Sequence, residues 1–378
     1  MGTDVVVVGA GPAGLAVGAC LQKRGIEPTI LDKTQAVGDS WRWRYDRLHL
    51  HTPRIQSSLP GLPIPKRFGQ FPSRDDVVRY LVGYARYHGL APRTGVEVQR
   101  IDRDGDGWAV TTSDGTYRAP QVVIATGYNH TARLPDWPGQ RDFPGEFLHA
   151  REYKNATPYV GRDVLVVGTG NTGAEIAADL AETGAGRVRL AVRTPPHVIP
   201  LTIGPIPTTL LGISNDYTPA PLADPVNGLL EQITIGDLSE YGMPTPETGI
   251  VEQFQETDVV PIIDVGLVEQ LKAGRVEPVA AVTGFEDTKV VLADGVRIEP
   301  EVVIAATGYR QGLEPVVGHL GVLDDTGRPT VHAADTHPAA PGLRFVGLTN
   351  PLKGLLFQIN IDARLVARAV DREFARVG

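Results

Sequence analysis

The sequence predicts an α/β protein that contains two nucleotide-binding βαβ units. The first unit reads as a strand over residues 4–8, a glycine-rich turn, a helix, and a strand over residues 27–31. The same order returns in the middle of the chain, with a strand over residues 163–167, a glycine-rich turn, a helix to about Thr183 and a strand over residues 187–192. Two such units in one chain predict a protein that binds two dinucleotides.

A second internal repeat supports two similar domains. Residues 96–128 contain short alternating segments, an Asp-Gly turn, and an apolar strand that leads into Ala-Thr-Gly-Tyr, and residues 275–309 repeat this order. The fold class is therefore α/β, with two Rossmann-like dinucleotide-binding domains and three-stranded β-meanders, as in flavoproteins that carry two such domains. A helical pattern over residues 357–374 ends the chain.

Composition and charge exclude several other classes of protein. A length of 378 residues favours two domains over one core. A net charge of -8 without a cluster of Lys and Arg argues against a nucleic-acid partner. Cys20 is the only cysteine, which excludes an internal disulfide and a redox-active cysteine pair, so we expect a reducing compartment, the cytoplasm. No apolar run is long enough to cross a bilayer.

The turn Gly9-Ala10-Gly11-Pro12-Ala13-Gly14 follows four valines and opens the first helix. Its first glycine permits the tight turn, its second lets backbone amides approach a pyrophosphate, and its third lets the helix pack on the strand. Asp32 lies 18 residues beyond the last glycine, where an acid binds a ribose hydroxyl. We therefore expect FAD at this unit. The expected contacts are Gly9, Gly11, Pro12, Ala13, Gly14, Asp32 and Lys33.

The second glycine turn, residues 168–173, repeats this device after the second apolar strand. Here the residue 20 positions beyond the last glycine is Arg193 instead of an acid. A guanidinium suits the 2′-phosphate of NADPH, although an arginine that merely faces solvent at a strand end is the alternative. The expected NADPH contacts are Gly168, Gly170, Asn171, Thr172, Gly173 and Arg193.

Two dinucleotides on one chain indicate that a nicotinamide reduces a flavin. We expect a discontinuous FAD-binding domain of residues 1–160 and 296–378, and an NADPH-binding domain of residues 161–295. Within the latter, residues 195–261 are rich in Pro, Gly and Thr and show weak periodicity. They are expected to form either a lid that contacts substrate or an irregular docking segment.

The segment from Phe143 to Tyr153 has the pattern Phe-x-Gly-x-x-x-His-x-x-x-Tyr and lies just before the second unit. It resembles the signature of the class B flavin-dependent monooxygenases of the flavin-containing monooxygenase superfamily. The resemblance covers most of the chain except residues 195–261. Further stretches are similar to the YUCCA-like branch of that family: Gly38 to Trp41, Tyr45 to Leu48, Phe71-Pro72, both Ala-Thr-Gly-Tyr segments, and Gly354 through Ala363.

This resemblance implies that NADPH reduces FAD, that O2 then adds to form a C4a-peroxyflavin, and that one oxygen atom passes to a small, partly apolar substrate. Such chemistry requires a dry, preorganised pocket more than a side-chain acid or nucleophile. The YUCCA-like branch points to an aromatic 2-oxo acid such as indole-3-pyruvate, with amines and sulfides as other candidates. The expected partners are a small-molecule substrate and O2, and a homodimer is compatible with the sequence.

Three residues are candidates for a part in catalysis. The resemblance implies that His149, the signature histidine, couples the two domains, whereas a packed structural histidine is the more common alternative. Several amine- and sulfur-oxidising members place an asparagine near the flavin, and His51 or Thr52 takes that position here. The signature closes with Tyr153-Lys154 instead of Trp, which disfavours Baeyer-Villiger activity.

Four more residues are expected at the flavin. Thr126 and Gly127 belong to the first Ala-Thr-Gly-Tyr segment. Gln358 begins the last helix, whose N-terminus points at the flavin pyrimidine in such folds and stabilises a reduced, anionic ring. Trp41 either lines the flavin or substrate pocket or anchors the first unit.

Two other functions compete with a monooxygenase. A flavoprotein reductase or oxidase would use the same cofactors and pass electrons from NADPH to a quinone or to O2. A regulator that senses nucleotides would use both units only to bind them, and the signature segment would then have no purpose.

Overall fold

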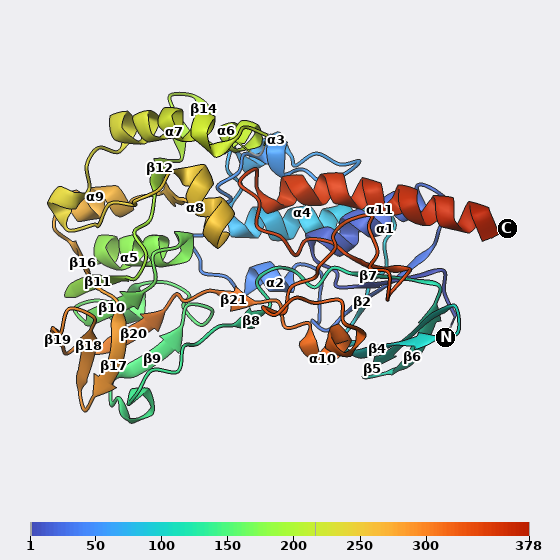
Figure 1. Cartoon of the computed structure of the whole chain (residues 1–378), viewed down its shortest axis with the longest axis horizontal. Coiled ribbons are helices and arrows are strands. Elements are labelled where there is room, and N and C mark those ends of the chain that lie inside the picture. The colour runs from blue at the N-terminus through green and yellow to red at the C-terminus, as the bar shows by residue number, and fades with distance from the viewer. Residues whose placement is uncertain (1, 216, 378) are drawn as a thin grey trace. The chain divides into compact units, whose positions relative to one another are not determined.

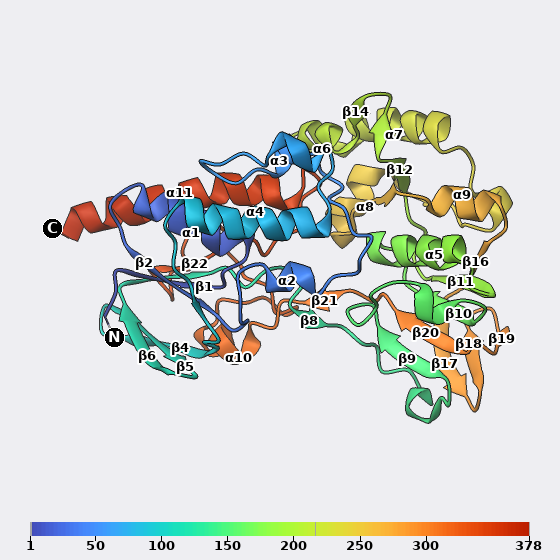
Figure 2. The same ribbon diagram turned by 180° about the vertical axis from the view of Figure 1, so that it is seen from behind.

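The computed structural model describes residues 2–215 and 217–377 and divides into two units (Figure 1, Figure 2). Unit 1 contains Met1–Trp43, Thr52–Thr131 and Tyr309–Gly378, and unit 2 contains Arg44–His51 and Ala132–Gly308. Each unit has its own five-stranded parallel sheet and its own three-stranded antiparallel meander. The predicted fold class, with two dinucleotide-binding domains, is therefore confirmed.

The sheet of unit 1 has the strand order β22-β7-β1-β2-β3. Its strands are β1 (Val5–Val8), β2 (Pro28–Asp32), β3 (Arg93–Thr94), β7 (Gln121–Ile124) and β22 (Leu343–Phe345). All four valines of β1 are buried, because both faces of a parallel sheet are covered. Val7 pairs with Ile30 on one side and Val123 on the other, so the first glycine turn lies at the end of a central strand.

Helices cover one face of this sheet and the meander covers the other (Figure 1). The helices are α1 (Pro12–Gln22), α4 (Arg74–Tyr87) and α11 (Leu355–Val377), and the meander strands are β4 (Val98–Asp104), β5 (Gly107–Thr112) and β6 (Gly115–Ala119). Trp108 and Tyr117 of the meander share one apolar core with Val6 and Val122 of the sheet. The shorter elements of this unit are α2 (Asp39–Arg42), α3 (Arg54–Ser57), η1 (Lys66–Phe68), α10 (Glu314–Val317) and η5 (Gly318–Leu320).

The sheet of unit 2 has the strand order β16-β11-β10-β20-β9. Its strands are β9 (Glu146–His149), β10 (Asp163–Val167), β11 (Arg187–Val192), β16 (Val276–Ala280) and β20 (Val302–Ala305). Helices α5 (Asn171–Thr183) and α9 (Leu267–Lys272) pack on one face, where Ile176 and Leu271 meet Val164 and Val166. The meander of β17 (Val282–Glu286), β18 (Lys289–Leu292) and β19 (Arg297–Ile298) packs on the other.

The expected domain boundaries at residues 160/161 and 295/296 differ from the division in the structure. Residues 132–160 and 296–308 belong to unit 2, and so does the short segment 44–51. The reason is strand pairing. Strand β20 pairs with β10, and β9 pairs with β20, so both lie in the sheet of unit 2.

About half of the described residues in 195–261 are helical, so the segment has regular structure that the sequence pattern did not reveal. It contains α6 (Thr209–Asn215), α7 (Ala220–Thr234), η4 (Ser239–Tyr241) and α8 (Ile250–Thr257). Strand β12 (Val198–Pro200) precedes these helices and pairs with β15 (Ile262–Asp264), which follows them. Pro225 lies inside α7, and such prolines disrupt the helical pattern in the sequence. The remaining short elements are β8 (Thr131–Ala132), β13 (Thr202–Ile203), β14 (Ile206–Pro207), β21 (Tyr309–Arg310), η2 (Gln140–Asp142) and η3 (Thr157–Tyr159).

Among the described residues, none of the helices is both long enough and apolar enough to cross a bilayer.

Candidate functional site

The first glycine turn contains two glycines that the protein itself requires and one that it does not. A Cβ on Gly9, which has φ 108°, would lie 2.4 Å from the carbonyl oxygen of Ala125, and a Cβ on Gly14 would lie 1.8 Å from that of Gly9. Gly11 has an extended backbone, with φ -76°, and no atom lies within 4 Å of the position of its Cβ. The open space at Gly11 lies at the N-terminus of α1, where a pyrophosphate would approach.

Two side chains beside this turn fit a bound dinucleotide. The Asp32 carboxylate lies at the end of β2, accepts a hydrogen bond from the amide of Ala10 at 2.5 Å, and so holds the turn next to an acid. The hydroxyl oxygen of Thr126 is buried without a hydrogen-bond partner among the described residues. Because a buried hydroxyl without a partner is costly, Thr126 is well suited to bind a cofactor oxygen. Gly127 follows it with φ 88°. Lys33 instead points its Nζ to within 2.7 Å of Nε2 of His130, at the surface.

A second part of unit 1 brings Thr52 to the start of α11. A Cβ on Gly354, which has φ 86°, would lie 2.6 Å from Cγ2 of Thr52. The side-chain amide of Gln56 donates to the carbonyl of Lys353 at 2.7 Å, and the side-chain amide of Asn360 donates to the carbonyl of Ser58 at 2.6 Å. The segment that carries Thr52 is therefore held against the N-terminus of the helix that was expected to face the flavin ring.

Gln358 lies in the first turns of α11 but bonds within the helix. Its side-chain amide donates to the Asp362 carboxylate at 2.6 Å. Burial raises the pKa of Asp362, and the hydrogen bond from Gln358 opposes that shift. The side chain of Gln358, which was expected to contact the flavin, therefore has a carboxylate partner within its own helix.

The second glycine turn has the same division of roles. A Cβ on Gly173 would lie 1.9 Å from the carbonyl oxygen of Gly168, whereas no atom lies within 4 Å of a Cβ on Gly170. The Asn171 side chain, however, is engaged elsewhere: it donates to the carbonyl of Pro261 at 3.1 Å and accepts from the amide of Ile263 at 2.8 Å. It anchors the end of residues 195–261, which we call the insertion. The main-chain amides at the start of α5 are therefore the groups available to a phosphate.

Arg193 directly follows β11 and is exposed. No carboxylate among the described residues forms an ion pair with it. A guanidinium in this position is available to an anionic ligand, as the sequence analysis expected of a 2′-phosphate contact.

The signature segment, residues 143–153, lies in unit 2. The ring of Phe143 packs edge-to-face on Phe285 with centroids 5.3 Å apart, and a Cβ on Gly145 would lie 2.5 Å from Cζ of Phe143. The Tyr153 hydroxyl donates to the Asp179 carboxylate of α5 at 2.5 Å. Packing therefore explains the spacing of the signature. Gly145 makes room for the ring of Phe143, and the hydroxyl of Tyr153 bonds to α5.

His149 is held as a neutral ring. Its Nε2 lies 3.1 Å from the carbonyl oxygen of Gly308, and its Nδ1 accepts the amide of Arg151 at 3.0 Å. Burial lowers the pKa of His149, which outweighs the contribution of the Gly308 carbonyl. Because one nitrogen donates and the other accepts, this imidazole lacks the free lone pair of a general base.

Residues 44–51, which we call the strap, lie on unit 2 although the chain on both sides of them belongs to unit 1. His51 Nε2 lies 2.9 Å from Glu175 Oε1, and Arg47 lies 3.0 Å from Glu182. The amide of Asp46 also donates to the carbonyl of Lys154 at 2.8 Å. The partners of the strap on α5 are spaced as i, i+4 and i+7, so they share one face of the helix. They are Glu175, Asp179 and Glu182.

His51 and Thr52, the two alternatives for one position near the flavin, have different surroundings in the structure. The His51 ring contacts Glu175 within unit 2, whereas Thr52 lies beside the start of α11 within unit 1. Tyr45 and Glu175 were missed. Burial and the Glu175 carboxylate raise the pKa of Tyr45 well above its usual value, so the two form a buried polar pair at the start of α5. The i, i+4, i+7 acids of α5 were the signal that could have revealed this face.

His197 joins separate parts of the insertion to one another. Its Nδ1 lies 2.7 Å from a Glu231 carboxylate oxygen of α7, and its Nε2 lies 2.8 Å from the carbonyl oxygen of Thr248. Both partners only accept, so both ring nitrogens must carry protons. Burial by itself lowers the pKa of His197, but Glu231, the Thr248 carbonyl and the nearby Asp224 outweigh it, and the pKa is raised.

We expect the insertion to loosen as the pH rises. A histidine with a raised pKa stabilises the folded contact fully below about pH 6.5, and this contribution is lost as the pH passes through the raised value. Limited proteolysis with an enzyme that cuts after leucine should therefore cleave at the exposed Leu222 and Leu229 faster at alkaline pH. His197→Gln should abolish this pH dependence, whereas His319→Gln, which alters an exposed pair with Asp102, should keep it. Equal pH dependence in both variants would contradict this explanation.

Comparisons with known proteins agree with this geometry. Residues 6–199 match the family described as pyridine nucleotide-disulphide oxidoreductase. The chain is 35% identical to indole-3-pyruvate monooxygenase YUCCA1 of Oryza sativa subsp. japonica, over 97% of this chain and 90% of that protein. It is 34% identical to the probable indole-3-pyruvate monooxygenase YUCCA3 of Arabidopsis thaliana, over 97% and 86%.

Among solved structures, a flavin-containing monooxygenase from Stenotrophomonas maltophilia is similar with a TM-score of 0.76 and 26% identity, covering 100% of this chain and 99% of that one. This likeness extends over both units. The chain therefore belongs to the flavin-containing monooxygenase family, in its YUCCA-like branch, and is a flavin-dependent monooxygenase that uses FAD and NADPH.

Proposed function

We propose that this enzyme transfers one oxygen atom from O2 to a small, partly apolar organic substrate. The observation that carries the proposal is the pair of glycine turns, each with one glycine beside open space, in a chain whose relatives are monooxygenases. When bound, FAD supplies the redox chemistry, because it accepts a hydride from NADPH and, once reduced, reacts with O2. The protein then has to bind and orient the cofactors and the substrate, and it has to exclude water from them.

In this proposal unit 1 binds the flavin. The amides at the start of α1 bind the pyrophosphate, Asp32 accepts from a ribose hydroxyl, and Thr126 donates its unsatisfied hydroxyl to the cofactor. Thr52 and the N-terminus of α11 support the ring, since the partial positive charge of a helix N-terminus stabilises an anionic reduced flavin.

Unit 2 binds NADPH in the same proposal. Gly170 leaves room for the pyrophosphate at α5, and Arg193 pairs with the 2′-phosphate. The neutral, fully hydrogen-bonded His149 positions the signature segment and moves no proton.

The names of the relatives suggest an aromatic 2-oxo acid such as indole-3-pyruvate as the substrate. Residues 194–271, which include the whole insertion, contain no Lys or Arg. The insertion therefore offers no cationic side chain to a substrate carboxylate, so an ion pair with that carboxylate has to come from an Arg or Lys outside the insertion.

The experiment is turnover under 18O-labelled O2 with NADPH and a panel of aromatic 2-oxo acids, amines and sulfides. A monooxygenase places one labelled oxygen in an organic product, detected by mass spectrometry, as NADPH is consumed. A reductase or oxidase would instead consume NADPH and release the oxygen as peroxide. With catalase present, which destroys free peroxide before it can decarboxylate a 2-oxo acid, such an enzyme would leave every organic compound unlabelled. That second outcome for the whole panel would overturn the proposal.

Arg193→Ala should reduce the preference for NADPH over NADH. A charge-assisted hydrogen bond to the 2′-phosphate contributes roughly 1.5–3 kcal/mol, so we expect the KM for NADPH to rise about 10- to 100-fold. The KM for NADH, which lacks that phosphate, should change little. An equal effect on both coenzymes would show that Arg193 only faces solvent.

A further inference from the structure

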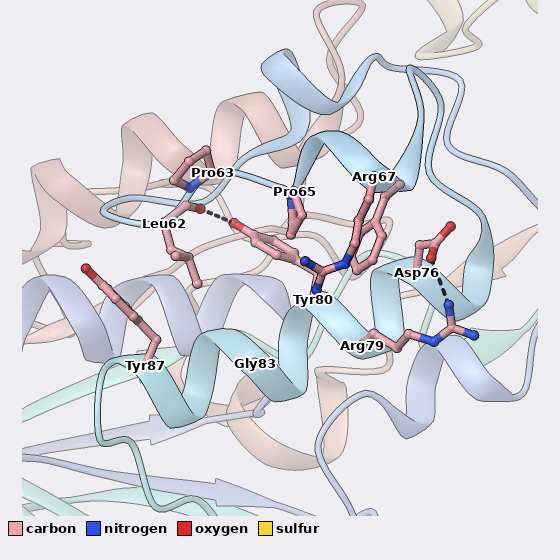
Figure 3. Close-up of a pocket in the computed structure, with 10 residues that line it drawn as sticks. Leu62, Pro63, Pro65, Arg67, Asp76, Arg79, Tyr80, Gly83 and Tyr87 are labelled. Atoms are coloured by element: carbon pink, nitrogen blue, oxygen red, sulfur yellow. Dashed lines mark hydrogen bonds and ion pairs between the residues drawn. The ribbon is translucent and has the colours of Figure 1, made fainter.

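Unit 1 contains a pocket of about 430 Å³ between the turn from Leu62 to Phe68 and helix α4 (Figure 3). A volume of this size is in the range of small-molecule sites. Most of its wall is apolar or aromatic. It is lined by Leu62, Pro63, Pro65, Arg67, Phe68, Asp76, Arg79, Tyr80, Gly83 and Tyr87, none of which belongs to either glycine turn.

The turn that forms one wall is held in place by tyrosines of α4. The Tyr80 hydroxyl accepts the amide of Leu59 at 2.7 Å and donates to the carbonyl of Leu62 at 2.6 Å, as Figure 3 shows for the latter bond. The Tyr84 hydroxyl donates to the carbonyl of Pro60 at 2.6 Å. Both hydroxyls are engaged by residues 59–62, which lead into the turn, so Tyr80 presents its ring to the pocket and the wall is preformed.

The pocket has one positive charge in excess. The Asp76 carboxylate caps α4 through Ser73 and also pairs with Arg79 at 3.0 Å, so the charge of Arg79 is balanced. The Arg67 guanidinium lies over the Phe68 ring, 5.1 Å from its centroid, and pairs with no carboxylate among the residues that the structure describes. Its hydrogen-bond donors are available to an anion, while stacking on Phe68 limits its motion.

Gly83 leaves this pocket open. It lies inside α4, where glycine costs about 1 kcal/mol relative to alanine, and no atom lies within 4 Å of a Cβ on it. A larger residue would fit the fold and would project into the pocket. Gly228 offers a matched comparison, because it lies inside α7 with equally open surroundings and does not line the pocket.

We propose that this pocket binds a small aromatic carboxylate. The ring packs among the proline, tyrosine and phenylalanine side chains, and the carboxylate pairs with Arg67. A cation would meet an unbalanced guanidinium, and an uncharged ligand would leave it without a partner. The site is additional to those for FAD and NADPH, and it does not depend on the proposed reaction.

The test measures binding of 2-naphthoate to the FAD-loaded enzyme by calorimetry. Gly83→Leu should weaken binding at least about tenfold because leucine fills the pocket, whereas Gly228→Leu should bind as the wild type does. Arg67→Gln should weaken 2-naphthoate binding about tenfold and leave binding of uncharged 2-naphthalenemethanol unchanged. No binding to the wild type, or equal binding to Gly83→Leu, would overturn the proposal.

The natural ligand could be the substrate or a separate effector, and turnover distinguishes these two sources. With phenylpyruvate as the probe, a higher KM in Gly83→Leu at unchanged kcat identifies the pocket as part of the substrate's path. If KM is unchanged in Gly83→Leu but added 2-naphthoate no longer alters the rate of this variant, the pocket is an effector site. Both outcomes support a carboxylate site, and normal behaviour of Gly83→Leu in the binding and rate assays contradicts it.

Discussion

A valine at Gly11 is expected to give a folded protein that no longer retains FAD. The backbone of Gly11 is extended and the position of its Cβ is clear of protein atoms, so the protein itself tolerates a side chain there. A pyrophosphate at the N-terminus of α1 would occupy that same space. We expect affinity for FAD to fall roughly 100-fold or more, a loss of about 2.7 kcal/mol. Visible absorbance after gel filtration measures the retained flavin, and circular dichroism checks the fold.

Two further valines serve as controls. Gly14→Val should fail to fold, since its Cβ would lie 1.8 Å from the carbonyl oxygen of Gly9. Gly170→Val, whose site is as open as that of Gly11, should remain yellow but lose reduction by NADPH while dithionite still reduces it. If Gly11→Val kept its flavin and Gly170→Val lost it, the assignment of the cofactors to the two units would be reversed.

Replacing Arg344 with methionine should destabilise unit 1 by about 3 kcal/mol. Arg344 is 1% exposed and lies in β22. It donates to the carbonyl of Ala334 at 3.1 Å, to the amide oxygen of Gln121 at 2.5 Å, and to the Glu373 carboxylate of α11. Methionine leaves the buried amide oxygen of Gln121 and the part-buried carbonyl of Ala334 without this donor, while Glu373 is 38% exposed and can be hydrated.

Chemical denaturation, monitored through the loss of bound flavin, measures this effect in unit 1. Arg297→Met is the control, because Arg297 pairs with Glu286 at 2.8 Å where both side chains are half exposed. Surface pairs contribute about 0–1 kcal/mol, so this variant should unfold near the wild-type midpoint. Equal midpoints for the two variants would show that the bonds of Arg344 contribute no more than a surface pair.

The glycine turns and their surrounding elements could be predicted from the sequence because local geometry determines them. Gly14 is required by its contact with the carbonyl oxygen of Gly9 in the same turn, and the four valines of β1 are typical of a strand buried on both faces. The last helix was also predicted, with bounds of 357–374 against Leu355–Val377 in the structure. These features depend on residues near one another in the chain.

The domain boundaries could not be predicted, because they depend on which distant strand each short strand joins. Val302–Ala305 and Gln121–Ile124 carry the same apolar pattern before Ala-Thr-Gly-Tyr, yet the former pairs with β10 and the latter with β1. The strap was missed for the same reason. Arg47 and Glu182 form their ion pair across 135 residues, and nothing in the local pattern of either segment indicates the other.

The segmented course of the chain also determines the order in which the units can be completed during synthesis. Residues 132–308 of unit 2 leave the ribosome as one block after the strap, so unit 2 has all its strands before unit 1 does. Unit 1 must wait for β22 and for α11, which covers α1 and pairs Asp371 with Arg24 at 2.5 Å. Until that final helix emerges, the apolar face of α1 is exposed to other nascent chains, so chaperone dependence should concentrate on the half of the protein that begins first and finishes last.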